Sequence, residues 1–274
     1  MQRSNRTATP ALPPKLLEVQ ATPGQPVAHL DTTLGLTADE WALVREATHM
    51  QLVLTGLPGF LHVPASLLLS ARISGLAARY GAEQKDQGLE PGDIIKGTKL
   101  GLLASGPVWL AILGGAWVAH LQPLYRDESI RNATFKHALY DIAFRIPTGT
   151  ALSEEIVFRG ALLGMFSRKH TSLRAATTSA LLFGLWHVWP ALRQAVEGAG
   201  ARRASLKQVG SSVAAPLAFT YVAGLMLATL RYKSHSIVAP WLVHASANAA
   251  GYSAIWLAAR RDAKAKHRLP GASP

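Results

Sequence analysis

Long apolar runs without Asp, Glu, Lys or Arg dominate the middle of the chain and alternate with short polar segments. A run of roughly 18 or more such residues is long enough for a helix to cross a bilayer. Runs of this kind occupy residues 47–71, 101–118, 175–192, 208–230 and 234–259. A further segment, residues 138–167, is also apolar but contains Asp, Glu and Arg. The pattern predicts an all-α fold, a polytopic membrane helix bundle of about six spans with polar tails.

The same pattern divides the chain into four parts. Residues 1–46 contain several prolines among threonine, alanine and charged residues, and no apolar h-region follows the first arginines. We therefore predict a disordered or loosely attached N-terminal tail and no signal peptide. Residues 47–137 are expected to form N-terminal membrane helices with a charged loop, and residues 138–259 a second helix bundle. Residues 260–274 form a basic C-terminal tail.

The charge of the chain is strongly positive, with 28 Lys and Arg against 16 Asp and Glu and a net charge of +12. These cations cluster between the apolar runs, as expected for loops that face anionic lipid. A lipid bilayer is therefore a predicted partner, and nucleic acid is not. An even number of spans puts both termini on one side, and that side receives more of the Lys and Arg. The positive-inside rule then predicts a multi-pass protein of the cell membrane with cytoplasmic termini.

A first polar cluster interrupts the apolar pattern at Glu154, Glu155 and Arg159. Ionisable groups inside a membrane segment are costly and usually mark function. Successive helix positions point about 100° apart, so the two glutamates cannot face the same point. Glu155 and Arg159 have the i, i+4 spacing of a favourable ion pair. We expect this pair to neutralise Glu155 and to leave Glu154 facing the centre of the bundle, where it can act as a general base.

Two further clusters each pair residues that are one helical turn apart. Phe183 and His187 share a face of one apolar run, and His244 and Asn248 share a face of another. An imidazole and an amide on one face can donate to a developing oxyanion or bind a metal ion. The alternative for each cluster is structural, because His and Asn also form hydrogen bonds between membrane helices.

The order of the three motifs carries a family resemblance. Glu-Glu-x-x-Phe-Arg-Gly, then Phe-x-x-x-His, then His-x-x-x-Asn follow one another on successive apolar segments. This arrangement resembles the CPBP superfamily of membrane proteins. That superfamily includes the type II CAAX prenyl endopeptidases and the bacteriocin-processing and abortive-infection proteins. The resemblance covers about residues 138–252 and makes residues 138–259 a CPBP-like catalytic helix bundle.

The resemblance implies an intramembrane endopeptidase of the CAAX-like, glutamate type. Its substrate would be a peptide or a membrane-associated protein, cleaved near the C-terminus. Glu154 and His187 would activate a water molecule, and His244 and Asn248 would bind the oxyanion. The supporting positions are Glu155, Arg159 and Phe183.

No cofactor is predicted. The chain has no cysteine and no His-Glu-x-x-His motif. Asparagine is a poor zinc ligand, whereas its side-chain N–H is a good oxyanion donor. Zinc is the alternative, because the family is often described as metalloproteases. The ligands would then be Glu154, His187 and His244.

Other intramembrane proteases and transporters would carry other sequence features. A rhomboid-like serine protease needs Gly-x-Ser-Gly in a span, and the sequence has none. A presenilin-like aspartyl protease needs Gly-x-Gly-Asp in a span, but the sole Gly-Asp here, Gly92 and Asp93, lies in the charged loop. A transporter would be expected to show internal repeats, and none is evident. The alternative that stays open is a non-catalytic membrane immunity or peptide-binding protein of the same family.

Overall fold

Helices make up all the secondary structure in the described part of the chain. The computed structural model describes residues 34–125, 127–198 and 206–267, and no strand occurs in these ranges. The chain divides after Thr37, and the helices belong to the unit that begins at Ala38. The prediction of an all-α helix bundle is confirmed.

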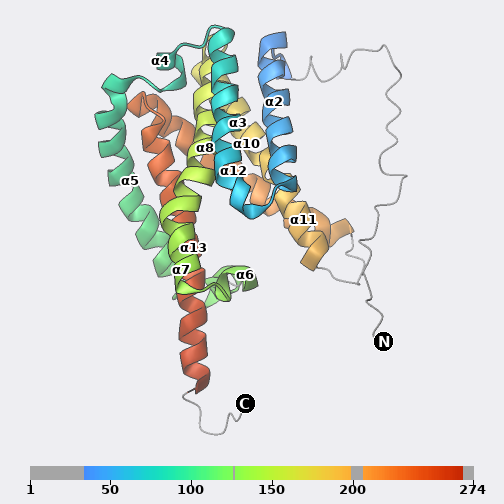
Figure 1. Ribbon diagram of the computed structural model, residues 1–274, viewed down its shortest axis with the longest axis vertical. Coiled ribbons are helices and arrows are strands. Elements are labelled where there is room, and N and C mark those ends of the chain that lie inside the picture. Colours follow the sequence, from blue (N-terminus) through green and yellow to red (C-terminus); the bar gives the residue numbers. More distant parts are fainter. Residues whose placement is uncertain (1–33, 126, 199–205, 268–274) are drawn as a thin grey trace, which may run out of the picture. The chain divides into compact units, whose positions relative to one another are not determined.

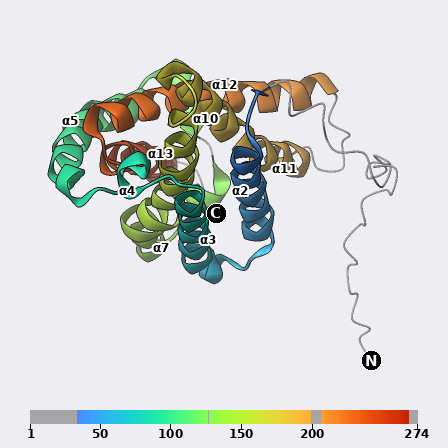
Figure 2. The ribbon, with the colours of Figure 1, turned by 90° about the horizontal axis from the view of Figure 1, so that it is seen from above.

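Most of the longer helices run along a common axis, whereas the helix over residues 206–234 is inclined to it (Figures 1 and 2). In chain order the elements are α2 (Ala38–Gly56), α3 (Gly59–Arg79), α4 (Gln84–Gln87), η2 (Pro91–Asp93), α5 (Ile94–Gly115), η3 (Ala119–Tyr125), α6 (Glu128–Arg131), α7 (Phe135–Tyr140), η4 (Asp141–Leu152), α8 (Ser153–Glu155), η5 (Ile156–Leu162), α9 (Leu163–Ser167), α10 (Ser172–Trp186), α11 (Val188–Gly198), α12 (Leu206–Ser234) and α13 (Val238–His267).

The first apolar run, predicted as one span, is a pair of antiparallel helices. α2 ends at Gly56, α3 begins at Gly59, and the two helices pack side by side (Figure 2). Pro58 has no backbone N–H and disfavours helical geometry at Leu57, which favours a break between two helices at this point. Pro58 itself is extended, with φ −58° and ψ 144°. The chain therefore reverses direction here.

Three helical segments of the described chain are long and apolar enough to cross a membrane. They are Gly59–Arg79, Gln84–Gly115 and Val213–Ser234. The total of six spans stays a prediction. Because the first run forms two helices, Ala38 and His267 lie at opposite ends of the bundle (Figure 1). The side of the membrane on which each terminus lies also stays a prediction, since it depends on whether α2 crosses the bilayer.

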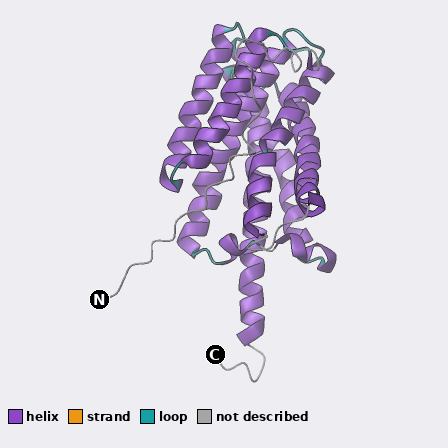
Figure 3. Cartoon of the chain, turned by 90° about the vertical axis from the view of Figure 1, so that its right-hand side faces the viewer, coloured by secondary structure: helices purple, strands orange, loops and turns teal. Residues whose placement is uncertain are grey.

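Parts of both predicted tails are helical. Residues 38–46 form the first turns of α2, and residues 260–267 continue α13, which extends beyond the other helices (Figure 3). Residues 1–33 and 268–274 of the two predicted tails lie outside the described residues.

A stripe of small residues on α5 allows α13 to approach closely. Gly97, Gly101 and Ser105 are buried and repeat every four residues, which is the spacing of small-residue contacts between membrane helices. A Cβ atom on Gly101 would lie only 3.1 Å from the Cα of Ala239 on α13. The absence of a side chain at this position is therefore a packing requirement.

Replacing Gly101 with alanine is expected to lower the free energy of unfolding by about 1–3 kcal/mol, because the backbone of α13 must move to accept the methyl group. Thermal unfolding of the purified protein in detergent measures this effect. Gly106→Ala on the same helix is the matched control, since a Cβ there meets nothing within 4 Å. An equal loss of stability in both variants would contradict the close α5–α13 contact.

A continuous helical run over residues 135–167 passes through the middle of the bundle and comprises α7 to α9. Its η4 and η5 segments are π-helical, a widened geometry that is rare and frequent at functional sites. Trp241 Nε1 of α13 donates to the carbonyl oxygen of Pro147 at 2.8 Å. Ser179 Oγ of α10 donates to that of Phe158 at 2.7 Å. These bonds attach the run to its neighbours on both sides of α8, which carries the two adjacent glutamates.

Candidate functional site

A buried ionic network joins the first and third polar clusters. Glu155 Oε1 accepts hydrogen bonds from Arg159 Nη1 at 3.0 Å and from His244 Nδ1 at 2.8 Å. Glu155 and Arg159 are completely buried, and His244 is nearly so. The i, i+4 pair that the spacing predicts is present, and its carboxylate has a second partner on α13. Nδ1 of His244 faces Glu155, so the other ring nitrogen, Nε2, lies on the edge of the imidazole that faces away from Glu155.

Glu154 lies on that opposite side. Its Oε2 atom is 3.8 Å from His244 Nε2, and the residue is 8% exposed. Oε2 itself is buried and has no hydrogen-bond partner among the described residues. A buried polar atom without a partner costs free energy. The carboxylate is therefore arranged to receive a hydrogen bond from a molecule that enters the bundle.

His187 follows the last residue of α10 and has a defined tautomer in its neutral form. Its Nδ1 lies 2.8 Å from the carbonyl oxygen of Phe183. A carbonyl oxygen only accepts, so Nδ1 carries the hydrogen and Nε2 of the neutral ring holds a lone pair. The ring of Phe183 packs edge-to-face with both imidazoles, with centroid distances of 4.7 Å to His187 and 5.7 Å to His244. The guanidinium of Arg159 lies 4.1 Å from the centroid of the same ring, so Phe183 connects the second cluster to the ionic network.

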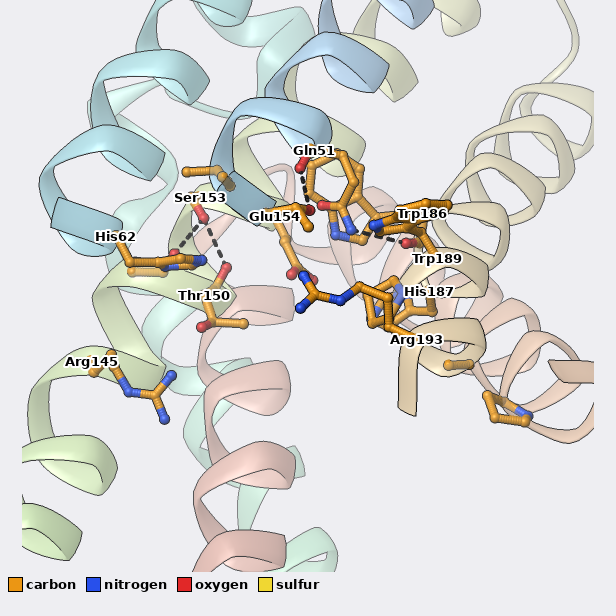
Figure 4. Close-up of a pocket in the computed structure, with 16 residues that line it drawn as sticks. Gln51, His62, Arg145, Thr150, Ser153, Glu154, Trp186, His187, Trp189 and Arg193 are labelled. Atoms are coloured by element: carbon orange, nitrogen blue, oxygen red, sulfur yellow. Dashed lines mark hydrogen bonds between the residues drawn. The ribbon is translucent and has the colours of Figure 1, made fainter. Parts of the chain in front are cut away.

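Glu154 and His187 line one cavity, which has a volume of about 720 Å³ (Figure 4). α2, α3, η4, α8 and α11 contribute to its wall, together with Trp186 at the end of α10. The guanidinium of Arg193, on α11, points toward the carboxylate of Glu154 (Figure 4). The other polar or aromatic lining residues include Gln51, Thr55, His62, Arg145, Thr150, Ser153 and Trp189.

Residues 137–250 match the model of a protein family, that of type II CAAX prenyl endopeptidase Rce1-like proteins. The matched segment contains the ionic network, Glu154 and His187. This segment, which is less than half of the chain, is similar to the Rce1-like family. The prediction drawn from the order of the three motifs is thereby confirmed. Comparisons with curated proteins and with solved structures found no match.

The Rce1-like region and the three apolar helices together identify a membrane protein. α2, α3 and α5 lie outside the Rce1-like region. They nevertheless pack against it, α3 on η4 and η5 and α5 on α13. The site is therefore built from both the matched and the unmatched part of the chain.

The predicted oxyanion pair lies next to the cavity and not in its wall. His244 reaches Glu154 through Nε2, but neither His244 nor Asn248 is a lining residue. Asn248 follows His244 by one turn of α13 and is partly buried. The structure thus brings Glu154, His187 and His244 into one region, and the role of Asn248 stays a prediction.

Several polar lining residues were not among the predicted site residues, and the largest of them are Gln51, His62, Arg145 and Arg193. Gln51 and His62 come from α2 and α3, and Gln51 Nε2 donates to the carbonyl oxygen of Trp186 at 3.2 Å. Arg145 belongs to η4 and forms an ion pair with Asp141, while Arg193 belongs to α11. In the sequence these residues are distinguished only by being polar inside or beside apolar runs. Polarity alone does not indicate which of them face the cavity.

The alternative prediction for this region is a zinc site. Among the described residues, no group of three or more His, Asp or Glu side chains is arranged to hold a metal ion. Nδ1 of His244 is bonded to Glu155, and Nδ1 of His187 to the carbonyl oxygen of Phe183. These bonds leave Nε2 of both imidazoles free, as in a histidine that binds a metal ion, so the zinc alternative stays a prediction. The chemistry below is derived from the side chains of the chain itself.

Proposed function

We propose that the chain is an intramembrane endopeptidase that hydrolyses a peptide bond near the C-terminus of a peptide or a membrane-associated protein. The observation that carries this proposal is the placement of Glu154 and His187 in one cavity, with Glu154 Oε2 buried and lacking a hydrogen-bond partner. A carboxylate and a neutral imidazole with a free lone pair are the two acceptors that a water nucleophile needs. The Rce1-like match supports the class of reaction.

In the proposed reaction, a water molecule donates one hydrogen to the Glu154 carboxylate and the other to Nε2 of His187. This orients an oxygen lone pair toward the carbonyl carbon of the substrate. Glu154 accepts the proton as the oxygen–carbon bond forms, and it returns that proton to the amine nitrogen as the carbon–nitrogen bond breaks. The products are a carboxylic acid, which keeps the second hydrogen of the water, and an amine, and the acid then loses its proton to the amine or to solvent.

The developing oxyanion is assigned to His244 and Asn248. With a second proton on Nε2, His244 becomes an N–H donor, and the Glu155 carboxylate at Nδ1 stabilises the resulting imidazolium. In that state Glu154, Glu155, Arg159 and His244 have no net charge together, which favours their common burial. Asn248 would supply the second donor through its amide N–H.

The proposal is tested by incubating the purified protein in detergent with a library of peptides. Wild-type protein is expected to cleave a subset of them, and His187→Ala is expected to reduce turnover by about 10²–10⁴-fold because the water loses one of its two acceptors. His49→Ala is the matched control, since His49 is exposed on α2. Equal turnover in the two variants would reject the assigned role of His187.

Cleavage is expected to be unchanged by a chelator. In the proposed mechanism the water is activated by Glu154 and His187 alone, so EDTA removes nothing that the reaction uses. The measurement is the initial rate of cleavage before and after EDTA treatment, followed by addition of zinc. Loss of activity with EDTA and its recovery with zinc would instead assign Glu154, His187 and His244 as metal ligands.

A second candidate function is a non-catalytic membrane protein, of the immunity or peptide-binding kind, that uses the same cavity. The direction of the Arg193 side chain favours it, because a cation beside Glu154 competes with water for the carboxylate (Figure 4). Peptides that bind without being cleaved, and cleavage that stays absent in Arg193→Gln, would favour this function over the peptidase.

A further inference from the structure

A second cleft lies between α2 and α3, at the end of the bundle where α2 begins and α3 ends. Its volume is about 690 Å³. It shares no lining residue with the catalytic cavity, whose residues on these helices come from the later turns of α2 and the first turn of α3. The cleft is lined by Ala42, Arg45, Glu46, Arg72, Gly75, Leu76, Arg79 and Tyr80.

The charge of this cleft is positive. Three arginines meet a single glutamate, and Arg72 Nη2 forms an ion pair with Glu46 Oε2 at 3.1 Å. Arg45 and Arg79 are exposed, and neither forms an ion pair with a residue that the structure describes. Two cations are therefore in excess. Guanidinium groups, with their planar arrangement of donors, match phosphate and carboxylate oxygens in pairs.

The cleft also has room for a ligand. Gly75 lies on α3 between Arg72 and Arg79, and a Cβ atom added to it would meet nothing within 4 Å. The helix therefore leaves an open floor between the arginines. Tyr80, the residue after the last turn of α3, adds a hydroxyl group at the rim.

The position of the cleft along α3 indicates what kind of molecule carries the anion. α3 is one of the three described helices long and apolar enough to cross a membrane. Leu68, one turn before Arg72, is 71% exposed, as expected for a side chain that faces acyl chains. Arg72 and Arg79 lie in the last two turns, where such a helix leaves the hydrocarbon region. At this level the abundant anion is the phosphate of a lipid headgroup.

We propose that the cleft between α2 and α3 binds a phosphate group, and that the phosphate belongs to an anionic phospholipid whose acyl chains lie along α3. Arg45 and Arg79 bind the phosphate oxygens, and Gly75 provides the space for the headgroup. The inference does not depend on the proposed peptidase activity, because it rests on a separate cleft and predicts binding alone.

The test uses the purified full-length protein in detergent. Phosphatidylglycerol is added, and the rise in melting temperature is recorded against lipid concentration, with phosphatidylcholine as the zwitterionic reference. Phosphatidylglycerol is expected to protect the wild-type protein at lower concentration. In the Arg45→Gln, Arg79→Gln double variant, the concentration for half-maximal protection is expected to rise more than about tenfold, since two charge-assisted contacts are lost.

A second variant and a matched control keep the result interpretable. Gly75→Leu fills the floor of the cleft, leaves every charge in place, and is expected to reduce protection to the same degree. The Lys96→Gln, Lys99→Gln double variant removes two cations from α5, which begins at the same end of the bundle, and is expected to respond to phosphatidylglycerol like the wild-type protein.

Protection that persists in the arginine variant, or an equal loss in the lysine control, would overturn the site. Inorganic phosphate forms the last arm of the experiment. Protection by phosphatidylglycerol but not by inorganic phosphate supports the lipid as the source. Equal protection by both would overturn the lipid assignment and make the cleft a site for soluble phosphate.

Discussion

Replacing Glu154 with glutamine is expected to abolish peptide cleavage while leaving peptide binding intact. The amide has nearly the same shape as the carboxylate but cannot accept the proton of the attacking water. Loss of a general base typically costs about 10²–10⁴-fold in rate. Because Glu154 Oε2 has no hydrogen-bond partner in the described structure, the substitution breaks no existing hydrogen bond at that atom. The melting temperature should therefore change little.

The measurement for Glu154→Gln is turnover of a peptide that the wild-type protein cleaves, together with the dissociation constant of that peptide. Glu90→Gln is the matched control, since Glu90 is exposed and lies outside both clefts. Turnover at the wild-type rate in Glu154→Gln would remove this residue from the proposed mechanism. Loss of binding together with turnover would show that the carboxylate holds the substrate and does not activate water.

Replacing Glu155 with alanine is expected to have the largest effect on stability. The carboxylate accepts from both Arg159 and His244, and all three side chains are buried. Without Glu155, the completely buried guanidinium of Arg159 loses its ion-pair partner. Removing one partner of a buried pair destabilises a protein by about 3–5 kcal/mol. Thermal unfolding in detergent measures this change, and Asp262→Ala serves as control because its pair with Arg131 is partly exposed and contributes at most about 1 kcal/mol.

A double variant separates stability from chemistry in this network. Glu155→Leu combined with Arg159→Met removes both charges and fills similar volume, so most of the lost stability should return. Cleavage should stay low, because His244 no longer has an acceptor at Nδ1 that fixes its ring. Full activity in the refolded double variant would contradict the orienting role of Glu155. A drop of less than about 1 kcal/mol for Glu155→Ala alone would contradict the strength assigned to the buried pair.

Local spacing explains which parts of the site could be predicted from the sequence. Glu155 and Arg159 are four residues apart on one helix, so their ion pair follows from helix geometry alone. The contact between Glu155 and His244 joins residues that are 89 positions apart. It depends on how α13 crosses the central run, which no local pattern contains. The composition of the three clusters indicated a common site, but the hydrogen bonds within it required the fold.

The same distinction applies to the fold. Apolar runs predicted helices and a bundle, because length and hydrophobicity are local properties. The reversal at Pro58 was not predicted, since the run on both sides of it is equally apolar and its charge pattern is unbroken. The small-residue stripe on α5 was also not predicted. Gly97, Gly101 and Ser105 form a packing surface only against α13, and the sequence does not show that these two helices are neighbours. Arg193 directly follows the apolar run of residues 175–192, and no sequence pattern indicated that α11 would place it in the wall of the cavity.

The helix pair formed by that reversal has a consequence for how such chains can diverge. Gln51 of α2 and His62 of α3 line the cavity of Glu154 and His187, and both lie outside the segment that matches the Rce1-like family. Changes there would alter which peptide enters without touching the carboxylate, imidazoles or amide. Under the proposed function, two proteins with the same polar residues in residues 137–250 would then act on different peptides. The residues that select the peptide are expected in the part of the chain that carries no motif.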